Sequence, residues 1–445
     1  MSRLLPRFEA AWRRSDELFG LLAEGALLDQ PIPLRHPLIF YLGHLPAFAW
    51  NQIGAGALGL PSWNPEFNAL FERGIDPLGV DEHRGASQWP AEAAVLEYRD
   101  RVRETLRPLL ADYDAREERG DPVRDVFPMA LEHELMHQET LLYMIQQLPH
   151  AKKVRPGGAP KLPLGAPKSG NQKRLVTGGS VTLGTPRNPD GSFVWDNELP
   201  ERCVHVEPFL ADELPVQNGD FLEFVMDGGY QARSLWDAES WAWKERRRIE
   251  HPLFWAREEG SGKDKYKYNY YYYKTLFEDV PLTEAAAFPV YVSLAEARAY
   301  AAWRGERLMT EPEHHRAAYG TPEGPERSYP WGAEPPSESR GNFNFYRFSP
   351  SPAGSSPNGA SAWGVQELVG NGWEWTASPF APFPGFEVTL PSYPGYSSDF
   401  FDGCHYVMLG ASWATDAALV RKSFRNWFQP HYPFVFAKFR TVRLA

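Results

Sequence analysis

The chain has 445 residues, which is enough for two or three domains with separate hydrophobic cores. Its 46 basic and 57 acidic residues give a net charge of −11, which argues against a nucleic acid or an anionic membrane as a partner. Two cysteines, Cys203 and Cys404, allow at most one disulfide, so we expect a reducing, cytoplasmic environment. The sequence shows no signal peptide and no uninterrupted apolar stretch of about 18 residues that could span a membrane.

Four segments in the N-terminal third have the apolar spacing of amphipathic helices. They are residues 6–28, a stretch that runs through His44 to about Gly54, residues 90–118 and residues 125–147. Residues 57–88 are rich in turn-forming residues and are expected to connect two of these helices. Four helices with one connection of moderate length predict a bundle, in which facing helices often build a metal site.

The last of these helices contains the string LEHELMHQET, residues 131–140, with His133 and His137 four positions apart. Side chains at positions i and i+4 share one face of a helix, so both imidazoles can bind one metal ion. His44 offers a third imidazole from another helix, and three imidazoles leave coordination positions of a transition metal open. The string also matches H-E-x-x-H, in which Glu134 would be the general base of a zinc hydrolase. That alternative stays open, although the third histidine lies upstream of the motif.

Residues 153–174 are rich in Pro, Gly and Lys and predict a linker between a domain of residues 1–152 and one of residues 175–445. Beyond the linker, short β-like runs alternate with Gly, Pro and Asn turns, which indicates a mixed α+β domain. Helices are predicted at 218–226 and 293–303, the second with Ser293 and Glu296 as a capping box. The β-like runs are residues 180–183, 203–209 and 288–292.

Several motifs in the C-terminal domain resemble signatures of the formylglycine-generating-enzyme (sulfatase-modifying factor) fold, a variant of the C-type lectin fold. Such a domain behind a DinB-like four-helix bundle resembles the ergothioneine-type sulfoxide synthases, which are non-haem iron enzymes. The resemblance implies an α+β chain in which the bundle carries the iron ligands and the second domain covers the active site. Cys203 and Cys404 do not match the active-site cysteine pair of the formylglycine-generating enzymes. The matching motifs are residues 193–200, 215–225, 228–230, 303–311, 368–376 and 436–440.

The three-histidine iron site of this family corresponds to His44, His133 and His137. In the family, O2 is activated at Fe(II), and a sulfur or selenium donor is joined to the imidazole carbon between the two ring nitrogens of hercynine (trimethylhistidine). The resemblance therefore implies Fe(II) as cofactor and hercynine, O2 and a thiol or selenosugar donor as partners. A tyrosine that supplies a proton in some members corresponds to Tyr393, and Tyr396 is expected to line the pocket. The alternative is that both tyrosines line the pocket and neither supplies a proton.

An Asn-Trp pair of the family corresponds to Asn426 and Trp427. The trimethylammonium group of hercynine has no hydrogen-bond donor, so it requires aromatic faces around it. We therefore expect Trp427 to line the cation pocket and Asn426 to orient the carboxylate end of the substrate.

Phe428 and Tyr432 stand where members that use γ-glutamylcysteine have an Asp and an Arg. Without these charged partners, a desolvated zwitterionic donor would be left unpaired. Aromatic rings instead suit an uncharged, ring-shaped donor, because sugar faces stack on them. This pattern and the segment 33–44 resemble the selenoneine synthase branch, which takes a selenosugar. Arg73 and Arg84 lie in the loop in which family members often place a donor-binding arginine.

Three alternatives remain beside an enzyme that takes a selenosugar as donor. Within the same reaction class, free cysteine or γ-glutamylcysteine could be the donor. A zinc hydrolase that uses Glu134 is the alternative from another enzyme class. A lectin-like binding module with structural histidines is the third, although a binding module has no need of the histidine-bearing bundle.

Overall fold

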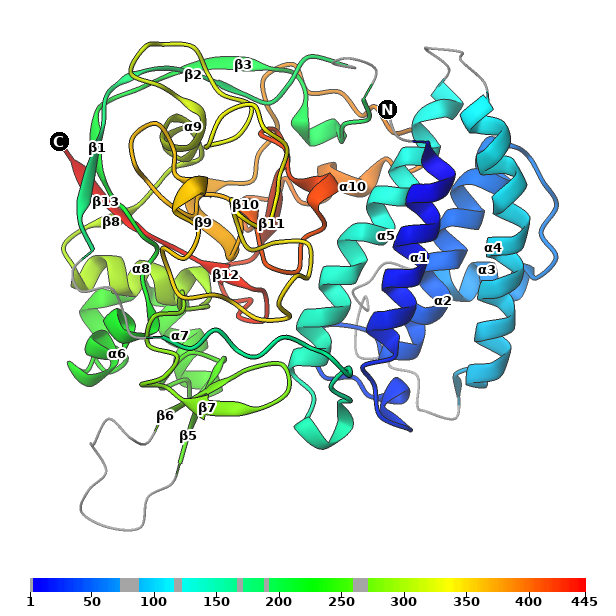
Figure 1. Cartoon of the computed structure of the whole chain (residues 1–445), viewed down its shortest axis with the longest axis horizontal. Helices are drawn as coiled ribbons and strands as arrows, with labels where there is room; N and C mark the ends of the chain where they lie inside the picture. Colours follow the sequence, from blue (N-terminus) through cyan, green and yellow to red (C-terminus); the bar gives the residue numbers. More distant parts are fainter. Residues whose placement is uncertain (1–2, 73–87, 116–121, 166–170, 188–191, 259–270) are drawn as a thin grey trace. The chain divides into compact units, whose positions relative to one another are not determined.

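A computed structural model of the chain describes residues 3–72, 88–115, 122–165, 171–187, 192–258 and 271–445 (Figure 1). The chain divides into two compact units. The first consists of Met1–Gly157, Asp190–Phe193 and Leu390–Tyr393, and the second of Gly158–Pro189, Val194–Thr389 and Pro394–Ala445. The short segment that ends at Tyr393 therefore belongs to the helical unit although it lies far along the sequence. The domain limits expected from the sequence, 1–152, 153–174 and 175–445, stay a prediction.

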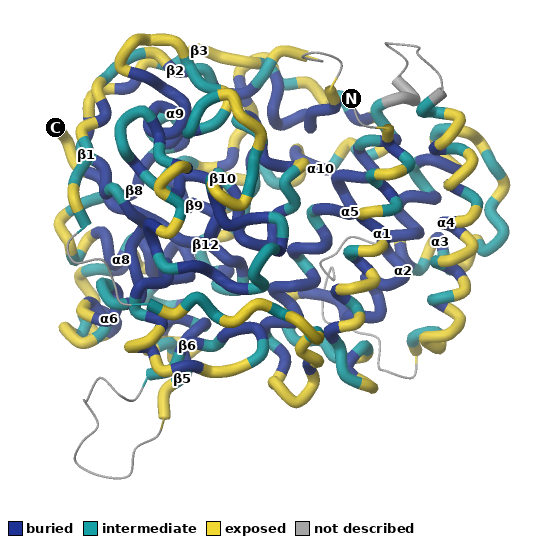
Figure 2. The backbone as a smooth tube through the Cα atoms, in the orientation of Figure 1, coloured by how far each residue is buried: buried dark blue, intermediate teal, exposed yellow. Residues whose placement is uncertain are grey.

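The first unit is built mainly of helices. Helix α2 (Leu38–Ala49) packs against α4 (Glu92–Ala115) and α5 (Pro122–Gln146), and α1 (Leu4–Phe19) packs against α4 and α5 (Figure 1). Every residue of α2 is buried, as its dark blue tube in Figure 2 shows. This helix is therefore the centre of the unit and has no solvent-facing side.

Two details of this unit differ from the sequence-based expectation. Helix α1 ends at Phe19, and Gly25, at φ 80°, turns the chain before the short helix η1 (Ala26–Leu28). Glycine adopts this left-handed conformation without steric cost. The predicted helix over residues 6–28 is therefore too long, because the apolar residues beyond Phe19 belong to a turn and a short second helix. The second difference is α3 (Pro65–Glu72), which lies in the stretch expected to be only a connection. Helix α2 continues directly into η2 (Trp50–Ala57), a π-helical segment.

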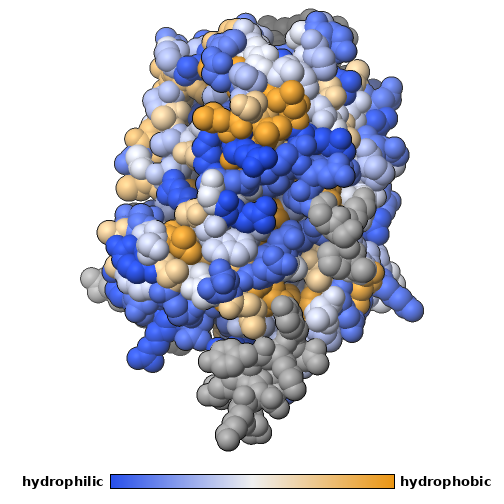
Figure 3. Space-filling view, turned by 90° about the vertical axis from the view of Figure 1, so that its left-hand side faces the viewer, coloured by the Kyte–Doolittle hydropathy of each residue, from blue (hydrophilic) through white to orange (hydrophobic). Residues whose placement is uncertain are grey.

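The second unit contains two four-stranded sheets. One has the order β1 (Lys173–Val176), β4 (Phe209–Asp212), β13 (Thr441–Leu444), β8 (Arg307–Leu308), with every pair antiparallel. The other has the order β11 (Asn426–Phe428), β10 (Tyr406–Ala411), β9 (Gly372–Pro379), β12 (Ala437–Lys438), and only its β12–β9 pair is parallel. Figure 3 shows the side of this unit on which β1 and β13 lie, a mainly hydrophilic surface with small hydrophobic areas.

Smaller elements complete this unit. They are the pair β2 (Gly179–Leu183) and β3 (Arg202–Val206), the sheet β5 (Trp255–Arg257), β6 (Tyr271–Lys274) and β7 (Asp279–Pro281), and the helices α6 (Asn218–Met226), α7 (Ala238–Arg247), α8 (Leu294–Trp303), α9 (Glu311–Tyr319) and α10 (Gly395–Ser398).

The predicted helix at 218–226 is confirmed as α6, and the capping box of α8 is present, since Ser293 accepts from Glu296 N and Glu296 accepts from Ser293 N. The predicted strand at 180–183 is found as β2. The strand predicted at 288–292 is wrong, because the stretch forms one isolated antiparallel bridge, Pro289 with Gln217, instead of a ladder. Its backbone bonds go to two different segments: Phe288 and Val290 bond to Asn218 and Val216, whereas Val292 N donates to the Ala437 carbonyl.

A buried ionic cluster lies where β9, β12 and the chain before β13 meet. Arg440 Nε donates to Glu374 Oε1 at 2.6 Å, and Lys438 Nζ lies 3.1 Å from Glu374 Oε2. All three side chains are fully buried. Burial alone would raise the pKa of the Glu374 carboxyl, but Arg440 and Lys438 outweigh it and lower this pKa to about 2.

Among the described residues, no helix is long and apolar enough to cross a membrane. Cys203 and Cys404 are both free and exposed.

We expect Glu374→Gln to lower the free energy of unfolding by about 3 kcal/mol at neutral pH, because it leaves two buried cations without their counter-charge. The difference from wild type should shrink as the pH falls from about 4.5 toward about 2, because in that window the unfolded wild-type chain takes up a proton at Glu374 while the folded chain does not. Denaturant unfolding at several pH values measures both effects. Glu338→Gln, in an exposed pair with Arg347, is the matched control and should change stability by less than about 1 kcal/mol. An equal effect of the two substitutions would contradict the prediction.

Candidate metal centre

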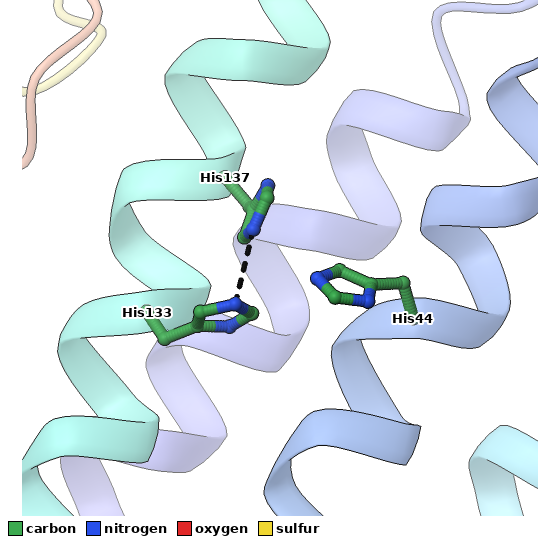
Figure 4. A group of neighbouring side chains, drawn as sticks. All are labelled: His44, His133 and His137. Atoms are coloured by element: carbon green, nitrogen blue, oxygen red, sulfur yellow. Dashed lines mark hydrogen bonds between the residues drawn. The ribbon is translucent and has the colours of Figure 1, made fainter. Parts of the chain in front are cut away.

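Three histidines from two helices of the first unit converge on one point. His44 comes from α2, and His133 and His137 come from successive turns of α5 (Figure 4). One ring nitrogen of each lies within 4.8 Å of the others, and all three side chains are buried. The Nε2 atoms of His133 and His137 are 3.1 Å apart. The structure therefore brings together the three residues that the sequence predicts as metal ligands.

The hydrogen bonding of His44 defines which of its nitrogens is available. Its Nδ1 lies 2.7 Å from the backbone carbonyl of Phe71, the next-to-last residue of α3. A carbonyl only accepts, so Nδ1 carries the proton and Nε2 carries the lone pair. Nε2 is buried and has no hydrogen-bond partner within the described residues. An imidazole held by one nitrogen with the other left open is the usual arrangement of a metal-binding histidine.

Burial keeps the three imidazoles uncharged. It lowers the pKa of His44 to about 4, with His36 adding to the effect. It holds the pKa of His133 and His137 well below the usual range, helped by the neighbouring histidines and, for His137, by Arg35. Neutral imidazole nitrogens are good ligands for first-row transition metals. The donor set therefore fits a divalent ion such as Fe(II) or Zn(II).

Glu134 does not share the face of the histidines. Its Oε1 accepts a hydrogen bond of 2.7 Å from Ser15 Oγ on α1, whereas His133 and His137 face His44 on α2. A general base of an H-E-x-x-H hydrolase must reach a water bound to the metal. The geometry thus gives Glu134 a helix-packing contact rather than the position of a catalytic base.

Tyr393 lies beside the histidines in the first unit. The centroid of its ring is 6.5 Å from that of His133 and 5.3 Å from that of Phe48. The preceding residue, Ser392, accepts a hydrogen bond of 3.3 Å from Gln52 on η2, which fixes this segment to the helical unit. The proposed proton donor is therefore close to the candidate ligands.

The other predicted pocket residues belong to the second unit, where they form two aromatic pairs. Tyr396 stands edge-on to Trp427 at 5.4 Å between centroids. Phe428 stacks on Tyr432 at 4.9 Å with an angle of 15° between the rings. Because side chains alternate along strand β11, Asn426 and Phe428 point to one face and Trp427 to the other. The expected roles of these residues stay predictions, and Arg73 and Arg84 lie outside the described residues.

Sequence reasoning missed two contacts of this site. One is the carbonyl of Phe71, for which no sequence signal exists because every residue has a backbone carbonyl. The other is the Phe48 ring, which lies 3.5 Å from the His133 ring with an angle of 5° between them. The four-residue spacing from His44 to Phe48 could have indicated that both share one face of α2.

Two family models match this chain. The DinB superfamily matches residues 7–141, and the sulfatase-modifying factor enzyme 1-like domain matches residues 161–445. Together they confirm the predicted fold class, a DinB-like helical bundle followed by a domain like that of the formylglycine-generating enzymes.

Several relatives resemble the chain, and two of those described next do so along most of its length. The hercynine oxygenase of Mycobacterium tuberculosis is 34% identical over 430 residues, which are 95% of this chain and 93% of the relative. Ergothioneine biosynthesis protein 1 of Neurospora crassa is 30% identical, over 99% of this chain and 57% of its own length. The inactive C-alpha-formylglycine-generating enzyme 2 of Bos taurus is 33% identical over 49% of this chain. With both domains matched in order, the chain belongs to the family of the hercynine oxygenases and ergothioneine biosynthesis proteins.

Proposed function

We propose that the chain is an O2-dependent non-haem Fe(II) enzyme that forms a C–Se or C–S bond at the imidazole carbon of hercynine. The observation that carries the proposal is the buried triad of His44, His133 and His137 in a chain of which 95% matches a hercynine oxygenase. Replacing a C–H bond and an Se–H or S–H bond by a C–Se or C–S bond is an oxidation, and O2 is the oxidant. Such an enzyme serves selenoneine or ergothioneine biosynthesis.

The three histidines would hold the iron through neutral nitrogens and leave other positions open for substrate and O2. When bound, iron supplies the activation of O2 that this oxidation requires. Phe71 fixes the orientation of His44 through its carbonyl. The burial of all three imidazoles excludes bulk water, which strengthens polar interactions inside the site.

Tyr393 is assigned the role of holding a proton near the reacting oxygen. Its ring lies next to His133 and Phe48 in the same unit, so the phenol is close to the ligands without being one of them. A tyrosine hydroxyl can act as a general acid from such a position.

Hercynine binding is assigned to Trp427, Tyr396 and Asn426. The edge-on pair of Trp427 and Tyr396 offers aromatic surface to a trimethylammonium group, which ring faces attract. Asn426 directly precedes Trp427, and its Oδ1 accepts a hydrogen bond of 2.8 Å from the backbone N–H of Trp427. Its Nδ2 can therefore donate a hydrogen bond to a carboxylate.

The donor is a selenosugar rather than γ-glutamylcysteine. Phe428 and Tyr432 occupy the positions of the charged residues that hold γ-glutamylcysteine in other members, and they stack on each other. This aromatic stack offers no charge to a zwitterion, whereas it supplies ring faces for a neutral sugar.

The first test is metal content. His137→Ala should abolish binding of Fe(II), because two histidines remain. Glu134→Gln should keep the bound metal and the activity, because its carboxyl contacts Ser15 instead of the histidines. Elemental analysis and O2 uptake with hercynine measure these outcomes. A purified protein that retains zinc and takes up no O2 with hercynine would refute the iron assignment. A hydrolytic activity that is lost in Glu134→Gln would then support the zinc hydrolase.

The second test concerns the proton. Tyr393→Phe should keep the metal but lower the rate of bond formation about 100-fold or divert the product, because the hydroxyl is lost and the ring is kept. Single-turnover kinetics and product analysis by mass spectrometry measure the effect. Tyr319→Phe, a buried tyrosine of the second unit, is the matched control. A Tyr393→Phe enzyme with wild-type rate and product would show that this ring is only pocket wall.

The third test compares donors. With hercynine, Fe(II) and air, turnover should be at least about 10-fold faster with a selenosugar than with γ-glutamylcysteine, a difference of about 1.4 kcal/mol in activation free energy. The double variant Phe428→Asp, Tyr432→Arg should reverse this preference by restoring the charged pair. Competition between the two donors at equal concentration measures the ratio, with free cysteine as a third arm. A preference for either thiol in the wild-type enzyme would refute the assignment of the donor.

A further inference from the structure

One stripe of helix α2 carries a candidate ligand and two phenyl rings. Phe40, His44 and Phe48 are spaced by four residues, so they share one face of the helix. The Phe40 ring stacks on His44 at 5.0 Å between centroids. Phe48 reaches across to α5, where its ring stacks on His133.

The contact between Phe48 and His133 is the closer of the two stacks. The ring centroids are 3.5 Å apart and the planes differ by 5°, so the rings lie face to face. Two neutral aromatic rings prefer an offset or edge-on arrangement to such a sandwich. A positive charge on one ring changes this preference, because the face of the other ring is negative and attracts a cation.

His133 is one of the three candidate metal ligands. Coordination of a divalent cation draws electron density from the imidazole and makes its face positive. The parallel stack on Phe48 is therefore suited to the metal-bound form of His133.

Neighbouring rings hold Phe48 in this place. Tyr393 stands edge-on to it at 5.3 Å, and His44 lies 6.3 Å away. Only 7% of the Phe48 surface is exposed. The ring of a histidine rotates in a broad energy well about its last torsion, so a flat neighbour is an effective way to fix its plane.

We propose that Phe48 is a positioning residue of the metal centre, whose ring fixes the plane of the His133 imidazole in the orientation that the bound metal requires. This role rests on the proposed function, because it presupposes that the triad binds a metal. Phe48 does for His133 what the carbonyl of Phe71 does for His44.

The test uses Co(II) as a probe of the site, because its absorption bands report ligand geometry and its binding needs no O2, hercynine or donor. Phe48→Leu should weaken Co(II) binding by about 10-fold and shift its ligand-field bands. Phe48→Tyr keeps a flat ring and should restore both toward wild type. Phe8→Leu removes another buried ring, which contacts Trp12 on α1 instead of a candidate ligand, so it controls for lost packing. It should lower thermal stability and leave the spectrum and affinity unchanged.

The outcomes distinguish failure of the role of Phe48 from failure of the metal centre itself. Wild-type affinity and spectrum in Phe48→Leu would refute the role of Phe48 and leave the metal centre intact. Equal changes in Phe48→Leu and Phe8→Leu would refute it as well, because they would reflect packing alone. A wild-type chain that binds neither Co(II) nor Fe(II) would refute the metal centre itself, and the role of Phe48 with it.

Discussion

The packing of α2 against α5 is the interaction on which the metal centre depends. Each helix alone presents fewer than three ligands, since His44 lies on one and His133 and His137 on the other. Helix α2 is buried on every side, so its orientation is set by packing around its whole circumference. The same stripe that carries His44 also places a phenyl ring on His133. Ligand geometry and core packing are thus determined by the same contacts.

This arrangement has an energetic cost in the protein without metal. Buried polar atoms are normally hydrogen-bonded, yet His44 Nε2 and His137 Nδ1 have no partner within the described residues. What sets the two imidazoles apart from other unpartnered buried groups is that both belong to the three histidines whose nitrogens lie within 4.8 Å of one another. A metal that binds the folded protein alone would offset the cost, because binding free energy then adds to folding free energy.

The sequence reveals this site in part. The spacing of His133 and His137 is a local signal that any helix would turn into a shared face. His44 is a candidate from the sequence alone, but its distance from the pair depends on how the helices pack, so the family resemblance is what singles it out as the third ligand. Helix α3 was missed, so the carbonyl that orients His44 could not be foreseen. On the second unit, the predicted Asn426 and Trp427 follow each other in the sequence, yet a strand sends neighbours to opposite faces.

The motif H-E-x-x-H shows why a string of residues does not define a chemistry by itself. In a helix, Glu134 is turned about 100° from His133, so its role depends on which neighbour covers that side. Here α1 covers it: Ser15 Oγ donates to Glu134, and Gln138 Nε2 donates to the Ala11 carbonyl at 2.9 Å. These bonds fix the rotation of α5 about its axis and thereby direct both histidines toward α2. The carboxylate that would serve as a base in a hydrolase contributes to this metal centre by orienting the helix that carries the ligands.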